Sequence, residues 1–176
     1  PVSQIDLKIT EPVIYYGELT EDYVYTGMDT YEFDYPRGDE NAFTKYDGLG
    51  GVPLNNWWRR LAYAYEQGSL KILISNYFTP NSRIHYYRQV SDRVRHAAPF
   101  LKYDNDPYLV VVDGRLKWII DAYTTSDRYP YSDIGKEGIN YIRNSVKVVI
   151  DAYHGSVSFY IADPSDPIVT TWAKIF

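Results

Sequence analysis

The second half of the chain contains two turn signals, each placed between apolar runs of strand length. They are Asp113-Gly114, between Tyr108–Val112 and Arg115–Tyr123, and His154-Gly155, between Ser145–Tyr153 and Ser156–Ile161. The tight turns of antiparallel hairpins need positive φ angles, which glycine adopts without strain. We therefore expect the C-terminal half to form an antiparallel sheet around two hairpins.

Helices are expected in the middle of the chain and at its end. Leu54–Gln67 carries apolar residues at the i, i+3, i+4 and i+7 positions of one helical face. The other candidates are shorter: Leu70–Ser75, Ser91–Ala98 and a last helix that Asp166 caps and Pro167 begins. We therefore expect residues 1–176 to form a single α+β domain, with the helices of residues 54–98 packed on the sheet.

The same patterns predict a core of large apolar side chains on the inner faces of these elements. Its expected members are Trp57, Trp58, Leu61, Val110, Trp118, Ile120, Val148, Ile150 and Trp172. Burial of each should stabilise the fold by about 1.5–3 kcal/mol.

Two segments nearly repeat thirty residues apart: Lys117–Tyr123 (KWIIDAY) and Lys147–Tyr153 (KVVIDAY). On a strand, alternate side chains point to opposite faces of the sheet. One face of each segment then carries Lys, an apolar residue, Asp and Tyr, and the other face is wholly apolar. We expect the apolar face in the core and the mixed face on the surface.

Aspartate is depleted in strands, so Asp121 and Asp151 at equivalent places need a physical reason. A structural interpretation, which we favour, has the carboxylates accepting hydrogen bonds from turn amides or pairing with Arg or Lys. A functional interpretation has them hold a cation or perform acid–base chemistry, and paired-carboxylate enzymes need a separation of about 5–9 Å. Asp127 and Arg128, in a polar and aromatic loop, are further catalytic candidates. The sequence contains no nucleophile elbow, Walker loop or His-Glu zinc motif that would support catalysis. We therefore favour a protein that is not an enzyme and leave the question of enzymatic activity undecided.

The candidate binding residues are long or aromatic side chains with polar tips on the mixed face and in this loop: Lys117, Tyr123, Lys147, Tyr153, Tyr129 and Tyr131. The chain contains 20 tyrosines. Because a tyrosine has an apolar ring and a polar hydroxyl, it suits both the rim of a sheet and a wet interface.

Several kinds of site are disfavoured by composition. A net charge of −5 argues against nucleic acid as the main partner. The absence of cysteine excludes thiol chemistry, and the three histidines lack zinc-like spacing. Asp104 and Asp106 offer alternate oxygen ligands, as calcium loops do, but without the glycine and distal glutamate of an EF-hand. We expect a turn there, with no metal and no cofactor.

Five segments carry a resemblance to the uncharacterised protein family 0182: Phe33–Asn41, Tyr46–Leu54, Pro99–Ser132, Asn140–Tyr153 and Asp163–Phe176. Members of that family are large bacterial and archaeal integral membrane proteins with an N-terminal group of membrane helices and a long extracytoplasmic region. The resemblance implies that this chain is a soluble, extracytoplasmic fragment of such a protein, whose parent lies in the cell membrane. It implies no reaction, because the family has no established catalytic residues to transfer. The sequence itself has no stretch near the roughly 18 apolar residues of a spanning helix.

The function expected from these observations is that of a non-catalytic interaction, sensing or structural domain of a cell-envelope membrane protein. Its expected partners are other envelope proteins or the rest of the parent protein. An envelope enzyme that uses paired aspartates, and a calcium-stabilised structural module, are the two alternatives.

Overall fold

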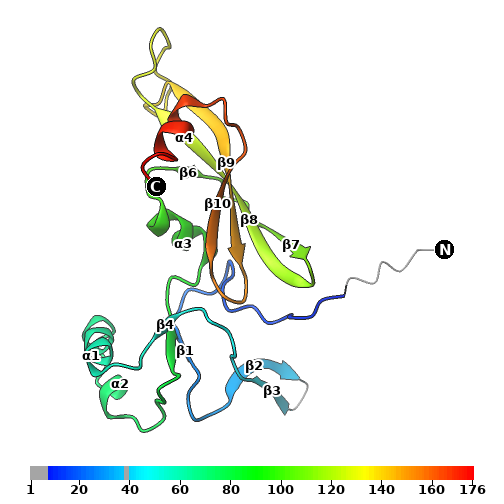
Figure 1. Cartoon of the computed structure of the whole chain (residues 1–176), viewed down its shortest axis with the longest axis vertical. Helices are drawn as coiled ribbons and strands as arrows, with labels where there is room; N and C mark the ends of the chain where they lie inside the picture. The colour runs from blue at the N-terminus through cyan, green and yellow to red at the C-terminus, as the bar shows by residue number, and fades with distance from the viewer. Residues whose placement is uncertain (1–7, 38–39) are drawn as a thin grey trace, which may run out of the picture. The chain divides into compact units, whose positions relative to one another are not determined.

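The structure is a computed structural model that describes residues 8–37 and 40–176, without the side chains of 33–42. The chain divides into two compact units, drawn in Figure 1. Residues up to Thr20 together with Gln89–Phe176 form the first, here named the sheet unit. Glu21–Arg88 form the second, here named the 21–88 unit.

The sheet unit contains one antiparallel sheet and two helices. The strands are β6 (Lys102–Tyr103), β7 (Tyr108–Val112), β8 (Arg115–Ser126), β9 (Tyr141–Asp151) and β10 (Val157–Ile161), and the helices are α3 (Val90–Ala97) and α4 (Pro167–Trp172). The strand order is β10-β9-β8-β6, and β7 also pairs with β8. The expected α+β class, with an antiparallel sheet from the C-terminal half, is confirmed.

Both predicted hairpins form, but their turns differ. Asp113 and Gly114 have φ angles of 52° and 78°, as a type I′ turn between β7 and β8 requires. Of His154 and Gly155, only Gly155 has a positive φ, of 70°. The Gly155 N–H donates to the Asp151 carbonyl, and the Asp151 N–H donates to Ser156, so the β9–β10 connection is longer than two residues.

The core lies on the sheet face that carries the apolar members of the two near-repeats. Trp118, Ile120, Val148 and Ile150 are buried, as predicted. The Trp118 indole N–H donates to the Tyr16 carbonyl at 2.9 Å, which attaches the N-terminal segment to the sheet. The α3 residues Val90 and Val94 and the α4 residue Val169 are also buried.

The 21–88 unit contains short strands and two helices. They are β1 (Val24–Thr26), β2 (Glu32–Arg37), β3 (Glu40–Thr44), β4 (Val52–Pro53), β5 (Arg83–His85), α1 (Trp57–Glu66) and α2 (Lys71–Ile74). β1, β5 and β4 form a three-stranded sheet, and β2 pairs with β3. α1 begins after Asn56, whose side chain accepts the Trp58 N–H at 2.8 Å. Of the helices expected from residues 54–98, α3 therefore belongs to the sheet unit, whereas α1 and α2 belong to this one.

The prediction that Trp57 and Trp58 are buried is wrong, because their side chains are 58% and 70% exposed. The two rings contact each other edge to face, with centroids 4.9 Å apart. Ala64 is the buried residue of α1, which packs against the short α2. An apolar stripe predicts which face of a helix packs against other elements. In a unit this small, the other elements are too few to bury every residue of that face.

Three other expected core residues, Leu61, Val110 and Trp172, are half-buried. Among residues 8–37 and 40–176, no helix has the length and apolar character needed to cross a membrane.

Candidate functional site

The mixed face of the sheet carries three of the predicted binding residues. Lys117 and Tyr123 of β8 and Lys147 of β9 are half-buried on the side opposite the core. In the antiparallel register, Lys117 lies opposite Asp151, and Asp121 lies opposite Lys147. The near-repeats therefore pair with each other, so that the lysine of each faces the aspartate of the other.

Asp121 is held by two neighbours on β9. The ammonium group of Lys147 donates to Asp121 Oδ1, and the Asn144 side-chain amide donates to Oδ2 at 2.9 Å. Burial acts to raise the pKa of Asp121, but the hydrogen bonds from Lys147 and Asn144 outweigh it and lower that pKa below its usual value. The Asp121 carboxylate is thus an ionised structural partner of Lys147.

Asp151 has a different role, in the turn after β9. Its Oδ1 accepts the N–H groups of Tyr153 and His154 at 3.0 and 2.8 Å. Asp151 lies four residues along β9 from the position opposite Asp121, a separation of about 13 Å along the strand. The two carboxylates are therefore farther apart than paired-carboxylate chemistry requires.

Tyr153 does not belong to the mixed face. Its ring is buried and meets the Tyr15 ring edge to face, with centroids 5.4 Å apart. Tyr153 and Tyr123 occupy equivalent places in the two near-repeats, but their surroundings differ. β9 ends at Asp151, so Tyr153 lies in the turn and not on the strand.

The loop between β8 and β9 holds four more of the predicted residues. Asp127 and Arg128 form an exposed pair with 3.8 Å between the carboxylate and the guanidinium. Tyr129 stacks on Tyr141 at 4.8 Å, and Tyr131 is fully exposed. Asp121 instead contacts Lys147 and Asn144 of β9, so the hydrogen bonds and ion pairs of the loop residues do not involve it.

The Asp104–Asp106 segment follows β6 and bends at Asn105. The Asp104 carboxylate accepts the Asn105 N–H at 2.7 Å, and the Asp104 N–H donates to the Asp121 carbonyl. Within the described part of the chain, no three His, Cys, Asp or Glu side chains come together as metal ligands would.

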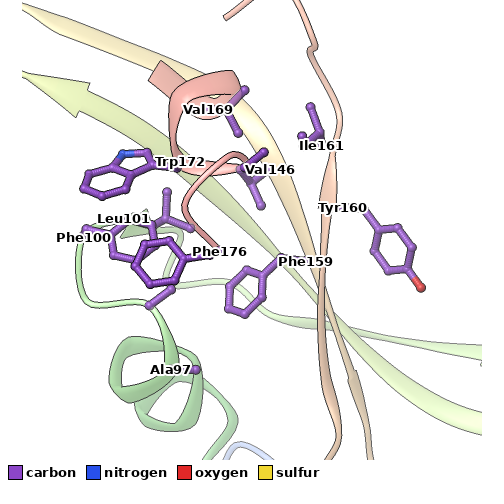
Figure 2. Close-up of a pocket in the computed structure, with 12 residues that line it drawn as sticks. Ala97, Phe100, Leu101, Val146, Phe159, Tyr160, Ile161, Val169, Trp172 and Phe176 are labelled. Carbon is purple, nitrogen blue, oxygen red and sulfur yellow. The ribbon is translucent and has the colours of Figure 1, made fainter. Parts of the chain in front are cut away.

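Sequence reasoning missed an apolar groove on the core side of the sheet, shown in Figure 2. It encloses about 400 Å³ between the C-terminal end of α3, strands β9 and β10, and α4. Its lining is Ala97, Ala98, Phe100, Leu101, Val146, Phe159, Tyr160, Ile161, Val169, Trp172, Ala173 and Phe176. None of these residues carries a charged side chain.

Stacked aromatic rings form one wall of the groove. Phe100 stacks on Trp172 with centroids 4.4 Å apart, and on Phe176 with centroids 5.1 Å apart. Phe159 and Ile161 of β10 lie on the other side and are 40% and 44% exposed. The groove is therefore an open apolar surface, partly aromatic, that the described residues leave in contact with solvent.

A buried carboxylate fixes α4, and with it the aromatic wall. Asp166 is fully buried. Its Oδ2 accepts the hydroxyls of Thr124 and Ser145, both at 2.5 Å. Its Oδ1 accepts the Tyr141 hydroxyl at 2.8 Å and the Ile168 N–H at 2.9 Å, which caps α4 as predicted.

Electrostatics around Asp166 favour its ionised form. Burial acts to raise its pKa, but the hydrogen bonds from Ser145, Thr124 and Tyr141 outweigh it, and the pKa lies below its usual value. The neighbouring Asp163 accepts from the Arg143 guanidinium at 2.7 Å. This turn is thus a rigid support for the groove.

The 21–88 unit has a larger cavity of about 630 Å³, with a more polar lining that includes Lys45, Asp47 and Arg83. The Arg83 guanidinium is used internally, because it donates to the Gly50 carbonyl at 2.5 Å and to the Leu49 carbonyl at 2.7 Å. We therefore take the apolar groove of the sheet unit as the candidate site.

Comparison with known proteins gives one consistent result. The sequence profile of the Uncharacterised protein family (UPF0182) matches residues 1–176. A UPF0182 protein of Trichodesmium erythraeum is 54% identical over 195 residues, covering 100% of this chain and 21% of the relative. One of Moorella thermoacetica is 56% identical over 176 residues, covering 99% of this chain and 19% of the relative. One of Methanospirillum hungatei is 51% identical over 176 residues, covering 97% and 20%.

The chain thus spans about one fifth of the length of these relatives. No solved structure matches the chain significantly.

Proposed function

The chain belongs to the uncharacterised protein family UPF0182, and from that premise we propose that it is a non-catalytic interaction domain of a cell-envelope membrane protein. The observation that carries the proposal is the open apolar groove between β10 and α4. In this proposal the groove binds polypeptide, and the parent protein is membrane-embedded with this region outside the cytoplasm.

The chemistry of the groove supports an apolar polypeptide as its occupant. Its walls are aliphatic and aromatic, and no charged side chain lines them. Contiguous exposed apolar surface is unfavourable in water, and such surface on a protein commonly marks an interaction site. The rings of Phe159 and Phe176, which are 40% and 82% exposed, would be removed from water by an occupant.

The rest of the same polypeptide is the occupant we propose. In the relatives, about four fifths of the length lies outside the region that this chain matches. A segment joined to the domain by a short flexible connection has an effective concentration in the millimolar range, and modest apolar contacts then suffice to fill the groove.

Thiol labelling of the full-length protein in its membrane tests the proposal with two matched variants. Ala173 lines the groove and is exposed, whereas Ala162 is exposed outside the groove. These 176 residues contain no cysteine, so Ala173→Cys and Ala162→Cys each add the single thiol of the region. Because both changes replace alanine, they disturb packing to a similar small extent.

An occupied groove predicts that Ala173→Cys reacts at least about tenfold more slowly than Ala162→Cys, which corresponds to about 1.4 kcal/mol of protection. Equal labelling rates at the two positions would remove the proposal. The same variants test location: a membrane-impermeant reagent should label Ala162→Cys in intact cells. Labelling only after lysis would contradict an extracytoplasmic position.

A further inference from the structure

Strand β10 forms one edge of the sheet, and its backbone pattern shows which groups face outward. β10 pairs with β9 alone, with Val157 opposite Ile150 and Ile161 opposite Val146. The same register continues at its ends, where the Ala162 N–H donates to the Ser145 carbonyl at 2.8 Å and the Asp151 N–H donates to Ser156 at 3.0 Å.

In an antiparallel pair, residues that exchange hydrogen bonds alternate with residues that do not. Ser156 and Ala162, which flank β10, form backbone hydrogen bonds with β9. By this alternation, Ser158 and Tyr160 also form backbone hydrogen bonds with β9. Val157, Phe159 and Ile161 are then the residues whose N–H and C=O groups point away from β9, toward the free edge. Within the described part of the chain, these outward groups make no hydrogen bond.

The same residues direct their side chains to the groove side of the sheet. Phe159 lies opposite Val148, which is buried in the core, so its side chain shares that face. Figure 2 shows the Phe159 ring turned toward Phe176 and the Tyr160 ring turned away from it. The free backbone edge and the apolar groove therefore belong to one continuous surface.

This edge lacks the features that usually prevent strand pairing. Natural edge strands carry charged side chains, prolines or bulges that block the addition of another strand. β10 has the sequence VSFYI, with neither charge nor proline, and its register with β9 is unbroken over five residues. An edge of this kind is suited to pair with another strand.

We propose that a segment of the same polypeptide, lying outside this region, adds to β10 as an extended strand and places alternate apolar side chains in the groove. This inference rests on the proposed function and specifies how the occupant binds. The added strand hydrogen-bonds to the outward N–H and C=O groups of Val157, Phe159 and Ile161. Its residues on the groove side pack against Phe159, Trp172 and Phe176.

An added strand can pair with the free backbone edge of β10 and also fill the apolar groove, whereas a helix can only fill the groove. A helix in the groove would cover the aromatic rings, but its backbone N–H and C=O groups are hydrogen-bonded within the helix. The outward N–H and C=O groups of β10 would then remain hydrogen-bonded to water. A strand spaces the side chains of one face two residues apart, which is also the spacing of Phe159 and Ile161 on β10. The geometry of β10 thus favours an extended segment whose apolar residues alternate.

Hydrogen exchange of the full-length protein distinguishes these arrangements at single residues. The inward N–H groups of Ser158 and Tyr160 are protected by β9 whatever fills the groove. Strand addition predicts comparable protection of the outward N–H groups of Val157, Phe159 and Ile161. Exchange of these outward groups at the rate of exposed amides, beside protected inward ones, would overturn strand addition.

A pair of substitutions at Phe159 tests the same point through the backbone. Phe159→Ala removes the ring and keeps the outward N–H, whereas Phe159→Pro removes both. Proline is tolerated here because the N–H it lacks is not used in pairing with β9. With Ala173→Cys as the reporter, strand addition predicts that Phe159→Pro increases thiol labelling at least about tenfold over Phe159→Ala. Equal labelling in the two variants contradicts it.

The outcomes separate this inference from the proposed function. A protected Ala173→Cys thiol with freely exchanging outward amides means that the groove is covered by a segment of another shape. An exposed thiol means that the groove is empty and that both proposals fail. Protection that is lost when the solubilised protein is diluted identifies a second copy as the occupant and overturns the assignment to the same polypeptide.

Discussion

Replacing Asp166 with alanine removes the carboxylate that joins α4 to the sheet. The helix cap on Ile168 is lost, which costs about 1 kcal/mol. The buried hydroxyl of Ser145 loses its acceptor, at about 1–3 kcal/mol, and the partly buried hydroxyl of Tyr141 loses one at about 1 kcal/mol. Thr124 has the Arg143 carbonyl at 3.5 Å as a second acceptor, so its loss is smaller. We expect the free energy of unfolding to fall by about 3–5 kcal/mol.

Urea unfolding followed by tryptophan fluorescence measures this change. In a background with Trp57→Phe and Trp58→Phe, the signal comes from Trp118 and Trp172, which both lie in the sheet unit. Asp163→Ala is the matched control, since Asp163 belongs to the same turn but its side chain is 30% exposed in its pair with Arg143.

The control should lose at most about 1 kcal/mol, as partly exposed ion pairs do. The reasoning about the buried carboxylate is refuted if Asp166→Ala loses less than about 1.5 kcal/mol, or no more than the control.

The pH dependence of Asp166 gives a second readout. Its folded pKa is lower than the ordinary value of 3.8. The stability it contributes is therefore present above pH 3.8 and is lost as the pH falls through the folded pKa. Asp166→Asn keeps the cap but does not titrate, so the stability gap between wild type and this variant should narrow as the pH falls below about 4. A gap that widens in acid would contradict this assignment.

Two further predictions concern burial and backbone space. Trp118→Ala should destabilise the sheet unit by about 3–5 kcal/mol, whereas Trp58→Ala should change stability by less than about 1 kcal/mol, because Trp118 is 9% and Trp58 70% exposed. Both values come from urea unfolding, and similar losses would contradict the exposed position of Trp58. Gly155→Ala should lower the free energy of unfolding by at least about 3 kcal/mol, because the new Cβ would lie 2.3 Å from the Tyr16 ring. Gly138 also has a positive φ, of +75°, but the space around it is open, so Gly138→Ala should lower the free energy of unfolding by about 1 kcal/mol. A comparable melting-temperature shift in the two glycine variants would contradict the close approach to Tyr16.

The parts of the fold that depend on local chemistry could be predicted from the sequence. The hairpin at Asp113-Gly114 forms as expected because both residues adopt the positive φ angles that the turn needs. Asp166 and Pro167 begin α4 because a capping carboxylate and a proline at the first helical position act within one turn. The apolar face of the near-repeats is buried because period-two alternation places it there.

The parts that depend on the whole fold could not be predicted in this way. The stripe of α1 identified Trp57 and Trp58 as apolar, but their burial needed a covering layer that the 21–88 unit does not supply. Asp121 and Asp151 occupy equivalent places in the sequence, yet only Asp121 pairs with lysine, because β9 ends at Asp151 and β8 continues to Ser126.

The groove escaped prediction because its walls come from distant parts of the sequence. Phe100, Phe159 and the pair Trp172 and Phe176 come from three segments, which meet when α4 is fixed on the sheet by Asp166. The signal present in the sequence was indirect: the VSFYI segment is the second strand of a hairpin and carries no charge. The Lys147 and Tyr123 face, which we predicted as the binding surface, stays a prediction.

Photo-crosslinking of the full-length protein tests the central claim most directly. The probe p-benzoylphenylalanine replaces Phe176, an exposed ring in the groove, and in a parallel variant it replaces Tyr131, an exposed ring in the β8–β9 loop. If the groove binds the rest of the polypeptide, irradiation links position 176 to a peptide from outside this region and leaves position 131 unlinked. Capture of lipid alone at position 176, or the same yield of polypeptide at both positions, would contradict a polypeptide-binding groove.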